Sequence, residues 1–352
     1  MPAVPSYAAL MDPVTALRRI AFLLERSRQP TYRVKAFRTA AAILGDLTVE
    51  DLDARVHART LTELAGIGPK TAAVAYEAAA GDTPAYLVGL QDEMGELTEA
   101  GHEIRGALRG DLHTHSDWSD GGSPIQEMAV TGLELGHEYQ AMTDHSPRLT
   151  VANGLTPARL RKQLGVVGAV NAALDQENSG FRLLTGIEVD INEDGTLDQE
   201  PELLAELDIV VASVHSKLRA DSRTMTTRML RAIDDPHIDI LGHCTGRLVT
   251  GGRGTRPESD FDSAAVFAAC AERGVAVEIN SRPERFDPPR RLLREAVDAG
   301  CLFSIDTDAH APGQLDWQVY GCERAEECGV PVDRIVNTWP VEQLLEWAGR
   351  DR

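Results

Sequence analysis

From residue 109 onward, short apolar segments alternate with longer amphipathic ones, and this alternation constrains the fold more than any other feature of the chain. Strands that alternate with helices predict a parallel sheet with helical crossovers, and seven such strands favour a closed or nearly closed barrel over an open sheet. The predicted strands are residues 110–115, 139–145, 182–191, 208–215, 238–244, 275–281 and 302–308. The predicted helices between them include residues 123–136, 157–178, 261–273 and 288–299.

Almost every predicted strand delivers a His, Asp or Glu near its end. His113 and His115 stand two residues apart, so both side chains point to one face of a strand, and Asp120 follows beside two glycines that permit a tight turn. A lone pair of this kind also fits a solvated strand. The carboxyl ends of parallel barrel strands share one face, however, so residues from several strands would meet there. The further candidates are His145, Glu188, His215, His243, Asp308 and His310.

These nine candidates are mostly imidazoles with a few carboxylates and no cysteine cluster. Such a set suits zinc, manganese or iron better than calcium. Nine ligands are too many for one tetrahedral ion, so we predict two or three divalent ions with Glu188 shared between them. Sites with several ions typically cleave phosphate esters, because one ion acidifies a water molecule while the others hold the phosphoryl oxygens.

The amino-terminal region predicts helices at residues 13–27, 32–44 and 48–58, followed by the sequence Gly66-Ile67-Gly68-Pro69-Lys70. Two glycines that bracket one apolar residue between helices can offer backbone N–H groups and a helix N-terminus to an anion, and Lys70 adds a charge. This turn resembles a helix-hairpin-helix motif, which binds a nucleic-acid phosphate backbone without reading bases. The alternative is a hairpin that serves only for packing.

The net charge of −20 argues against a generic nucleic-acid binder. Residues 1–84 nevertheless carry ten basic and nine acidic residues, and seven of the basic ones fall within residues 18–38. A solvated helix face would explain this stripe equally well. If the region does contact DNA, repulsion by the acidic remainder predicts weak, salt-dependent binding. The predicted DNA contacts are Arg33, Lys35, Arg38, Gly66, Gly68 and Lys70.

The chain divides by pattern into a helical domain at residues 1–84, a helical connector at 85–108 and a barrel at 109–352. No apolar run of about 18 residues could span a membrane, and the N-terminus lacks the zones of a signal peptide. Five cysteines without a C-x-x-C pair fit a reducing compartment. We therefore expect a cytoplasmic protein without a membrane partner.

The strand-end motifs together resemble the PHP (polymerase and histidinol phosphatase) domain family. The resemblance covers Asp111 to His115 with Ser119 to Gly121, Thr143 to His145, Glu188, Ser213 to His215, Gly242-His243 and Asp308 to His310. It implies a distorted (β/α)7 TIM-like barrel with a trinuclear metal centre, here preceded by a small all-helical domain. By this resemblance, His113, His115 and Asp308 hold one ion. His215 and His243 hold a second, with Glu188 bridging these two, and Asp120, His145 and His310 hold a third.

The closer resemblance is to bacterial family X DNA polymerases, carried by residues 32–38, 64–70, 242–248, 277–280 and 337–340. Residues 85–108 leave no room for the polymerase palm and fingers, so DNA synthesis is not expected. The resemblance implies 3′→5′ exonuclease activity or other processing of DNA 3′ ends in repair.

We therefore predict a hydrolase that acts on a phosphodiester or terminal phosphate at a DNA 3′ end. The predicted catalytic residues are Glu188, His145 as a proton relay and Arg247 as the ligand of the scissile phosphate. Weaker candidates for phosphate binding are Lys217, Arg253, Arg256 and Arg282. One alternative is a small-molecule phosphatase of the histidinol phosphatase type, and another is a DNA-binding scaffold with an inert barrel.

Overall fold

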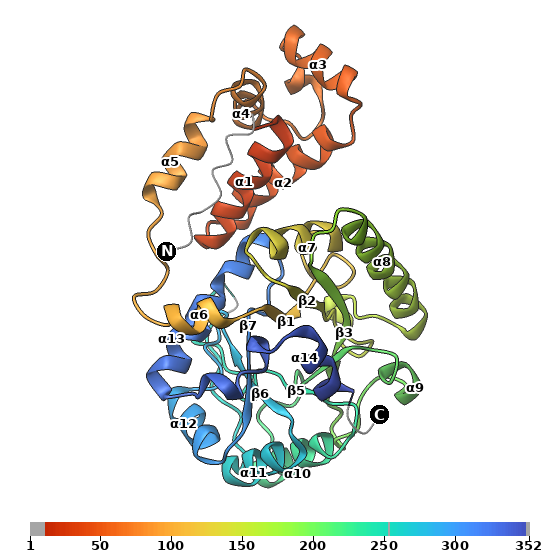
Figure 1. The fold of residues 1–352 in the computed structure, drawn as a ribbon, viewed down its shortest axis with the longest axis vertical. Coiled ribbons are helices and arrows are strands. Elements are labelled where there is room, and N and C mark those ends of the chain that lie inside the picture. The colour runs from red at the N-terminus through yellow and green to blue at the C-terminus, as the bar shows by residue number, and fades with distance from the viewer. Residues whose placement is uncertain (1–10, 253, 350–352) are drawn as a thin grey trace. The chain divides into compact units, whose positions relative to one another are not determined.

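The computed structural model describes residues 11–252 and 254–349 and separates into two compact units, one ending at Glu96 and the other beginning at Leu97 (Figure 1). The first unit is entirely helical. The second contains seven parallel strands in chain order with helices around them, which confirms the predicted fold class. None of the described helices is both long and apolar enough to cross a membrane.

The helical unit is built on one apolar cluster. Asp12 caps the first helix by accepting hydrogen bonds from the N–H groups of Val14 and Thr15 at 2.9 and 3.1 Å. Apolar residues at helical spacing then face inward, among them Leu17, Ile20 and Leu24, all fully buried. The elements are α1 (Pro13–Arg26), α2 (Thr31–Gly45), α3 (Val49–Ala58), the short 3-10 helix η1 (Leu61–Glu63), α4 (Pro69–Ala79) and α5 (Ala85–Glu93).

The predicted hairpin turn lies between η1 and α4. Gly66 has a φ of +97°, and a Cβ atom there would approach Ile43 Cδ1 to 2.7 Å, so the turn requires glycine. Pro69 begins α4, where the missing N–H of proline costs nothing.

The seven strands pair in parallel, each with its neighbour in sequence. Four of them, β2, β4, β5 and β7, end two or three residues earlier than predicted, so the polar residues after these strands stand just beyond them. His113 and Glu188 lie within β1 and β3. The strands are β1 (Gly110–Thr114), β2 (Tyr139–Met142), β3 (Arg182–Asp190), β4 (Ile209–Ser213), β5 (Ile240–Leu241), β6 (Ala276–Asn280) and β7 (Leu302–Asp306).

Helices surround the strands (Figure 1). The main apolar cluster includes Val277, Ile279 and Phe303 from the strands and Met229 and Phe267 from the helices. Strands covered in this way are buried along almost their whole length, which explains why they appear in the sequence as continuous apolar runs. The helices of this unit are α6 (His102–Ala107), α7 (Ile125–Glu134), α8 (Pro157–Gln176), α9 (Pro201–Leu204), α10 (Ser222–Ile233), α11 (Ser263–Arg273), α12 (Arg290–Asp298), α13 (Gln318–Cys328) and α14 (Val341–Ala348), with 3-10 turns η2 (Thr150–Ala152), η3 (Pro312–Trp317), η4 (Val332–Arg334) and η5 (Val336–Thr338).

Side-chain amides join the first and last strands. β1 forms no ladder with β7, and an isolated bridge joins Thr114 to Ala309, which lies beyond the end of β7. Below that bridge, Asn337 accepts a hydrogen bond from the N–H of Ile305 at 2.8 Å and donates to the carbonyls of Ile305 and Gly110 at 3.1 and 3.2 Å. Gln318 donates to the same two carbonyls at 2.8 and 2.9 Å. These amides satisfy buried backbone groups that a continuous ladder would otherwise pair, and they close the barrel.

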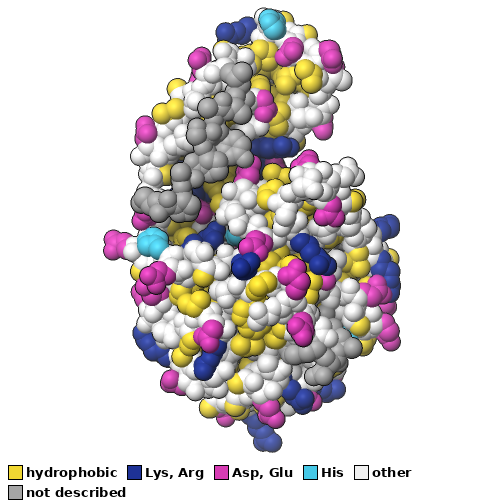
Figure 2. Space-filling model, in the orientation of Figure 1, with side chains coloured by type: hydrophobic (Ala, Val, Ile, Leu, Met, Phe, Trp, Pro, Cys, Tyr) yellow, Lys and Arg dark blue, Asp and Glu magenta, His cyan; other side chains and the backbone are white. Residues whose placement is uncertain are grey.

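The surplus of acidic residues is not gathered into one patch on the face of the barrel unit that Figure 2 shows. Asp and Glu side chains there are interspersed with Lys and Arg.

The closure of the barrel generates a stability prediction. The substitution Asn337→Ala removes the buried amide and leaves the N–H of Ile305 without its acceptor, while the carbonyls of Gly110 and Ile305 keep, among the described residues, only the hydrogen bonds from Gln318. We expect the free energy of unfolding in urea to fall by about 3 kcal/mol. The exposed residue Gln176 offers a control, since Gln176→Ala should change the free energy of unfolding by less than about 0.5 kcal/mol. Equal stability of the two variants would show that the amide contributes little to closure.

Candidate metal centre

The nine side chains predicted as metal ligands lie close together at the carboxyl ends of the strands. The ends of β1 and β7 are tied by a hydrogen bond from the N–H of His115 to the carbonyl of Ala309 at 2.8 Å. Asp308, beside that carbonyl, has a φ of +52°, a backbone conformation that non-glycine residues rarely adopt. Such strain is typical of functional sites, where the surrounding structure holds one residue in an unfavourable conformation.

Glu188, at the end of β3, occupies the centre of the cluster and is 1% exposed. Its carboxylate oxygens lie within ion-pair range of five imidazoles. The nitrogen-to-oxygen distances are 2.7 Å for His145, 2.9 Å for His243, 3.2 Å for His215, 3.4 Å for His113 and 3.6 Å for His115. One carboxylate thus touches side chains contributed by four other strand ends.

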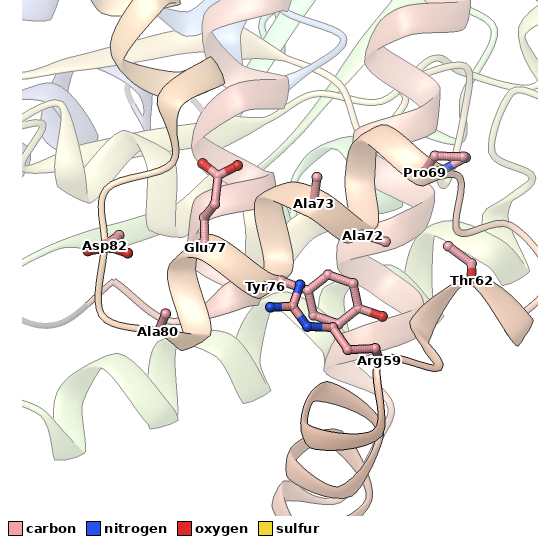
Figure 3. Close-up of a pocket in the computed structure, with 9 residues that line it drawn as sticks. All are labelled: Arg59, Thr62, Pro69, Ala72, Ala73, Tyr76, Glu77, Ala80 and Asp82. Carbon is pink, nitrogen blue, oxygen red and sulfur yellow. The ribbon is translucent and has the colours of Figure 1, made fainter.

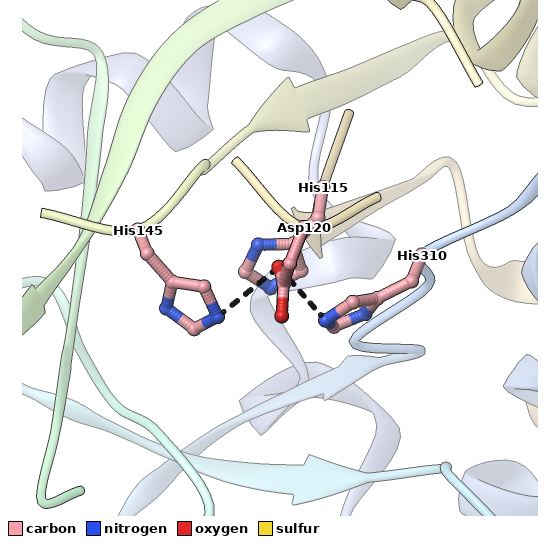
Figure 4. Close-up of side chains that lie close together, drawn as sticks. All are labelled: His115, Asp120, His145 and His310. Carbon is pink, nitrogen blue, oxygen red and sulfur yellow. Dashed lines mark ion pairs between the residues drawn. The ribbon is translucent and has the colours of Figure 1, made fainter. Parts of the chain in front are cut away.

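Three groups of ligand atoms lie close enough to share an ion. The first is His115, Asp120, His145 and His310, whose side chains point toward one another in Figure 4. The second is His113, His115 and Asp308, and the third is His145, Glu188 and His215. His115 and His145 each belong to two groups. His243 contacts Glu188 but falls outside the third group.

Buried nitrogens without hydrogen bonds show that this cluster fits metal ions. Among the described residues, both ring nitrogens of His115 and of His215 and the Nε2 of His113 are buried and make no hydrogen bond, although a carboxylate oxygen lies 3.2–3.6 Å from four of these five atoms. A buried polar atom left without a partner costs about 1–3 kcal/mol. Imidazole nitrogens and carboxylate oxygens are the donors that zinc, manganese and iron prefer, so bound ions would satisfy these atoms.

Electrostatics hold two of the histidine ligands and Glu188 in the protonation states that metal binding requires. Burial, with His310 and His145, lowers the pKa of His115 to about 3, and burial with Arg285 lowers that of His243 to about 4. Both rings are therefore neutral, as metal ligation requires. Burial would raise the pKa of Glu188, but His145 and His215 outweigh it and hold that pKa well below its usual value.

A second layer of carboxylates orients the histidines. Glu278 on β6 lies 2.6 Å from His113 Nδ1 and accepts the backbone N–H of His243. Asp190 accepts the N–H of His215 at 3.1 Å. Such partners fix the tautomer and direction of a ligating ring. Sequence reasoning assigned no role to either residue, although a charged residue inside a buried apolar strand is a signal that could have identified Glu278.

Two arginines from the loop after β6 contact Asp308. Arg285 Nε lies 3.0 Å from Asp308 Oδ2, and Arg282 NH1 lies 3.4 Å from Oδ1 and 3.2 Å from the Asp308 carbonyl. Burial would raise the pKa of Asp308, but Arg282 and Arg285 lower it well below its usual value. Arg285 was not among the sequence-predicted residues, and Arg282 was only a weaker candidate.

Arg247, the predicted ligand of the scissile phosphate, has other partners. Its Nε donates to the Arg285 carbonyl at 3.0 Å, its NH2 donates to the Phe286 carbonyl, and its NH1 lies 3.5 Å from Glu258. The guanidinium thus fastens the loop that carries Arg282 and Arg285. Arg253 lies outside the described residues.

Two of the predicted DNA contacts converge on Tyr86 in the helical unit. Lys70 Nζ lies 3.7 Å from the centre of the Tyr86 ring, and Arg33 NH2 donates to the Tyr86 hydroxyl at 2.7 Å. Arg33 also donates to Gln29 Oε1 at 2.6 Å. Lys35 is exposed. Tyr86 therefore gathers two cations close to the hairpin turn.

The remaining predicted contacts have local structural partners. Arg38 forms a two-point ion pair with the buried Glu25, with nitrogen-to-oxygen distances of 2.7 and 2.9 Å. The Gly68 N–H donates to the Thr71 hydroxyl at 3.1 Å. The first-turn N–H of Lys70 lacks a helical acceptor, because the first N–H groups of a helix have none.

A shallow pocket of about 490 Å³ lies beside the hairpin, and Figure 3 shows the side chains that line it. Pro69 and Thr62 lie at one end, and Glu77 and Asp82 lie toward the other. Arg59 stacks over the Tyr76 ring at 4.7 Å from its centre. The pocket belongs to the helical unit and shares no residue with the histidine cluster.

Comparisons with known proteins agree with the two-part organisation. The PHP domain family matches residues 111–282, and the helix-hairpin-helix domain family matches residues 11–83. The DNA polymerase/3'-5' exonuclease PolX of Bacillus subtilis (strain 168) is 38% identical over 267 residues, which are 73% of this chain but 45% of PolX. The chain thus spans less than half the length of that relative.

A "Probable phosphatase" of Shewanella halifaxensis is 30% identical over 246 residues, which cover 67% of this chain and 90% of the relative. Among solved structures, the histidinol phosphate phosphatase of Lactococcus lactis, complexed with zinc, L-histidinol and phosphate, has a TM-score of 0.45 and 16% identity. That match covers 63% of this chain and 94% of the solved one.

The shared position of His115 in two ligand groups generates a prediction. His115→Ala should reduce the number of manganese ions retained per chain after dialysis, measured by plasma mass spectrometry, by at least one relative to the unsubstituted protein. It should also shrink the rise in melting temperature on metal addition, because ions that bind only the folded state stabilise it by mass action. His57→Ala, an exposed site in the helical unit, should change neither quantity. Full metal content in His115→Ala would exclude this residue as a ligand.

Proposed function

Because the chain belongs to the PHP domain family and carries a helix-hairpin-helix domain, we propose that it is a metal-dependent phosphoesterase that processes DNA 3′ ends. The observation that carries the proposal is the cluster of imidazoles around the buried Glu188, several of whose ring nitrogens are buried and make no hydrogen bond among the described residues. Burying polar atoms without hydrogen bonds lowers the stability of the fold, and a barrel that binds no metal gains nothing in return. This argues against the alternative of a DNA-binding scaffold with an inert barrel.

The proposed ligands are the nine predicted side chains: His113, His115, Asp120, His145, Glu188, His215, His243, Asp308 and His310. When bound, two or three divalent ions supply Lewis acids for the phosphoryl oxygens and a deprotonated water as the nucleophile. Zinc, manganese and iron all suit this set of donors, so the identity of the metal stays open between them.

The protein itself supplies the charge that receives the phosphate. We assign phosphate binding to Arg285 and Arg282, because both guanidinium groups contact a metal-centre residue. Arg247 acts as a positioning residue, because it anchors the loop that carries both arginines. Planar guanidinium groups match the geometry of phosphate oxygens better than ammonium groups do.

His145 is the candidate for moving a proton. Its side chain is 8% exposed, and those of His215 and His310 are 12% and 17% exposed, whereas those of His113 and His115 are 0% exposed, so exposure places three rings at the rim. A ring at the rim of the cluster can exchange protons with solvent, which a fully enclosed ring cannot do. His145 also lies within ion-pair range of both Glu188 and Asp120.

Contact with DNA is assigned to the hairpin and the cations beside it. Lys70 and Arg33 lie around Tyr86, and the N-terminus of α4 favours an anion. The ion pair between Arg38 and Glu25 reduces the charge that Arg38 can offer to a phosphate. Few phosphate contacts and a net charge of −20 predict weak binding that falls steeply with salt.

Polymerase activity is not proposed. Residues 85–108 contain only α5, a connection and α6, so no polymerase domain separates the hairpin from the barrel. The second candidate function is hydrolysis of a small phosphate monoester. It is favoured by the Shewanella relative, which this chain covers over 90% of its length.

The proposed reaction predicts that manganese-loaded protein degrades or dephosphorylates a labelled DNA strand that carries a 3′-phosphate. His243→Ala should lower the rate by at least about 100-fold, because it removes a contact of the central carboxylate. His57→Ala should retain full activity. Hydrolysis of histidinol phosphate with no action on DNA would favour the second candidate.

The proposed DNA contact predicts a specific effect of Lys70→Ala. DNA affinity should fall, and the slope of log affinity against log salt should decrease by about 1, because one phosphate contact is lost. Hydrolysis of p-nitrophenyl phosphate should be unchanged. Lys162→Ala on α8 removes the same charge from the barrel unit and should leave the salt slope intact. Identical slopes for Lys70→Ala and Lys162→Ala would mean that the hairpin lysine does not contact DNA.

A further inference from the structure

We propose that a small pocket beside the metal centre, lined by Leu248, Thr250, Gly251, Gly252, Arg282 and Glu284, binds the sugar ring attached to the phosphate of a nucleotide substrate. This inference rests on the proposed phosphoesterase function and names the substrate group that the site recognises. No residue of the pocket is among the nine proposed ligands.

The pocket is held in shape by backbone hydrogen bonds. The Val249 N–H donates to the Glu284 carbonyl at 2.8 Å, which ties the loop after β5 to the loop after β6. Leu248 and Arg256 exchange two backbone hydrogen bonds of 2.9 Å each. Gly251 has a φ of +109°, and a Cβ there would approach Glu284 Cγ to 2.7 Å, so glycine permits this close packing. The walls are therefore fixed without a ligand.

Arg282 joins the pocket to the metal centre. Its NH1 lies 3.2 Å from the carbonyl of Asp308 and 3.0 Å from His310 Nδ1, while its Nε lies 3.5 Å from Glu284 Oε2 in the pocket wall. This Nε is buried and has no hydrogen-bond partner among the described residues. A phosphate held at the metal centre by Arg282 would therefore place its ester group at the mouth of the pocket.

The size and chemistry of the pocket favour a sugar. Its volume of about 150 Å³ is well below the roughly 300–1,000 Å³ that encloses a drug-sized ligand, so it suits a single ring. None of its six lining residues is aromatic, so it offers no surface on which a base could stack. Glu284 offers an acceptor and Arg282 offers donors, while Leu248 provides an apolar wall. A pentose presents hydroxyl and ether oxygens on an otherwise apolar ring.

Gly252 allows the pocket to be filled without disturbing its walls. A Cβ at this position would meet no atom within 4 Å, and its φ lies outside the left-handed region. Because Gly252 lines the pocket, the variant Gly252→Val adds bulk to its wall, and Gly252→Ala adds less. Gly165→Val is the matched control, because a Cβ added at Gly165 on α8 would likewise meet no atom within 4 Å.

The test compares thymidine 3′-monophosphate with glycerol 2-phosphate, an acyclic ester, on manganese-loaded protein. Gly252→Val should lower kcat/KM for the nucleotide by about tenfold or more, the range that steric exclusion from a pocket produces. The same variant should keep kcat/KM for glycerol 2-phosphate within about twofold of the value for the unsubstituted protein. For the nucleotide, kcat/KM of Gly252→Ala should lie between those of the unsubstituted protein and Gly252→Val. Equal losses for both esters, or no loss for either, would overturn the sugar pocket.

Calorimetric titration of thymidine 3′-monophosphate separates this inference from the proposed reaction. Weaker binding to Gly252→Val than to Gly165→Val supports the pocket even if neither ester is hydrolysed, in which case only the proposed reaction fails. Hydrolysis of both esters with identical binding to the two variants would reject the pocket and leave the phosphoesterase standing. Equal melting temperatures of the two variants exclude misfolding as the cause of any difference.

Discussion

The burial of Glu188 among five imidazoles is the interaction on which the rest of the barrel depends. A carboxylate that is 1% exposed is tolerated only when opposite charge or hydrogen-bond donors surround it. The surrounding histidines come from β1 and from the ends of β2, β4 and β5, so the strands must converge at this point for the charge to be compensated. Burial would lower the pKa of His113 and His215, but Glu278 and Glu188 raise that of His113 well above its ordinary value, and Glu188 with Asp190 raises that of His215 to about 9. Metal ions would replace these protons as the source of positive charge, so metal affinity should weaken as pH falls.

The same demand for compensation explains the buried polar groups further out. Glu278 orients His113 and fixes the backbone at His243, while Arg285 neutralises Asp308 from the opposite side. Arg247 in turn anchors the loop that presents Arg285. At the other end of the barrel, Asn337 and Gln318 join β1 to β7, which form no ladder with each other. The polar side chains around the metal centre and the amides between β1 and β7 both satisfy buried groups that strand pairing does not satisfy. Both therefore allow the strand ends to be spaced for the site rather than for a regular hydrogen-bond ladder.

The strand pattern and the grouping of the proposed metal ligands could be predicted from the sequence, whereas the residues that orient those ligands could not. The alternation of strands and helices follows from local periodicity, so the seven strands and their order were predictable. His113 and His115 could be placed together because side-chain direction along a strand depends only on spacing. The contacts of Glu278, Arg285 and Arg247 depend on pairing between segments more than 20 residues apart, which single-sequence patterns do not encode. The ion pair of Arg38 with Glu25 was hidden because it forms only when α1 and α2 pack together, so Arg38 was interpreted as one of the cations of a basic stripe.

Under the proposed function, the charge distribution would let two units of opposite charge serve one reaction. A barrel rich in acidic residues repels a polyanion except where metal ions and arginines make the local charge positive. Substrate would therefore be attracted only to the end of the barrel that carries the metal centre. The hairpin contributes a neutral-to-basic surface with cations held against Tyr86, whose ring limits their freedom and reduces the entropy lost on contact with a phosphate. Weak attraction at the hairpin and at the metal centre would allow the DNA end to bind and, after hydrolysis, to be released. An enzyme arranged in this way would act on exposed DNA ends without being retained along the duplex.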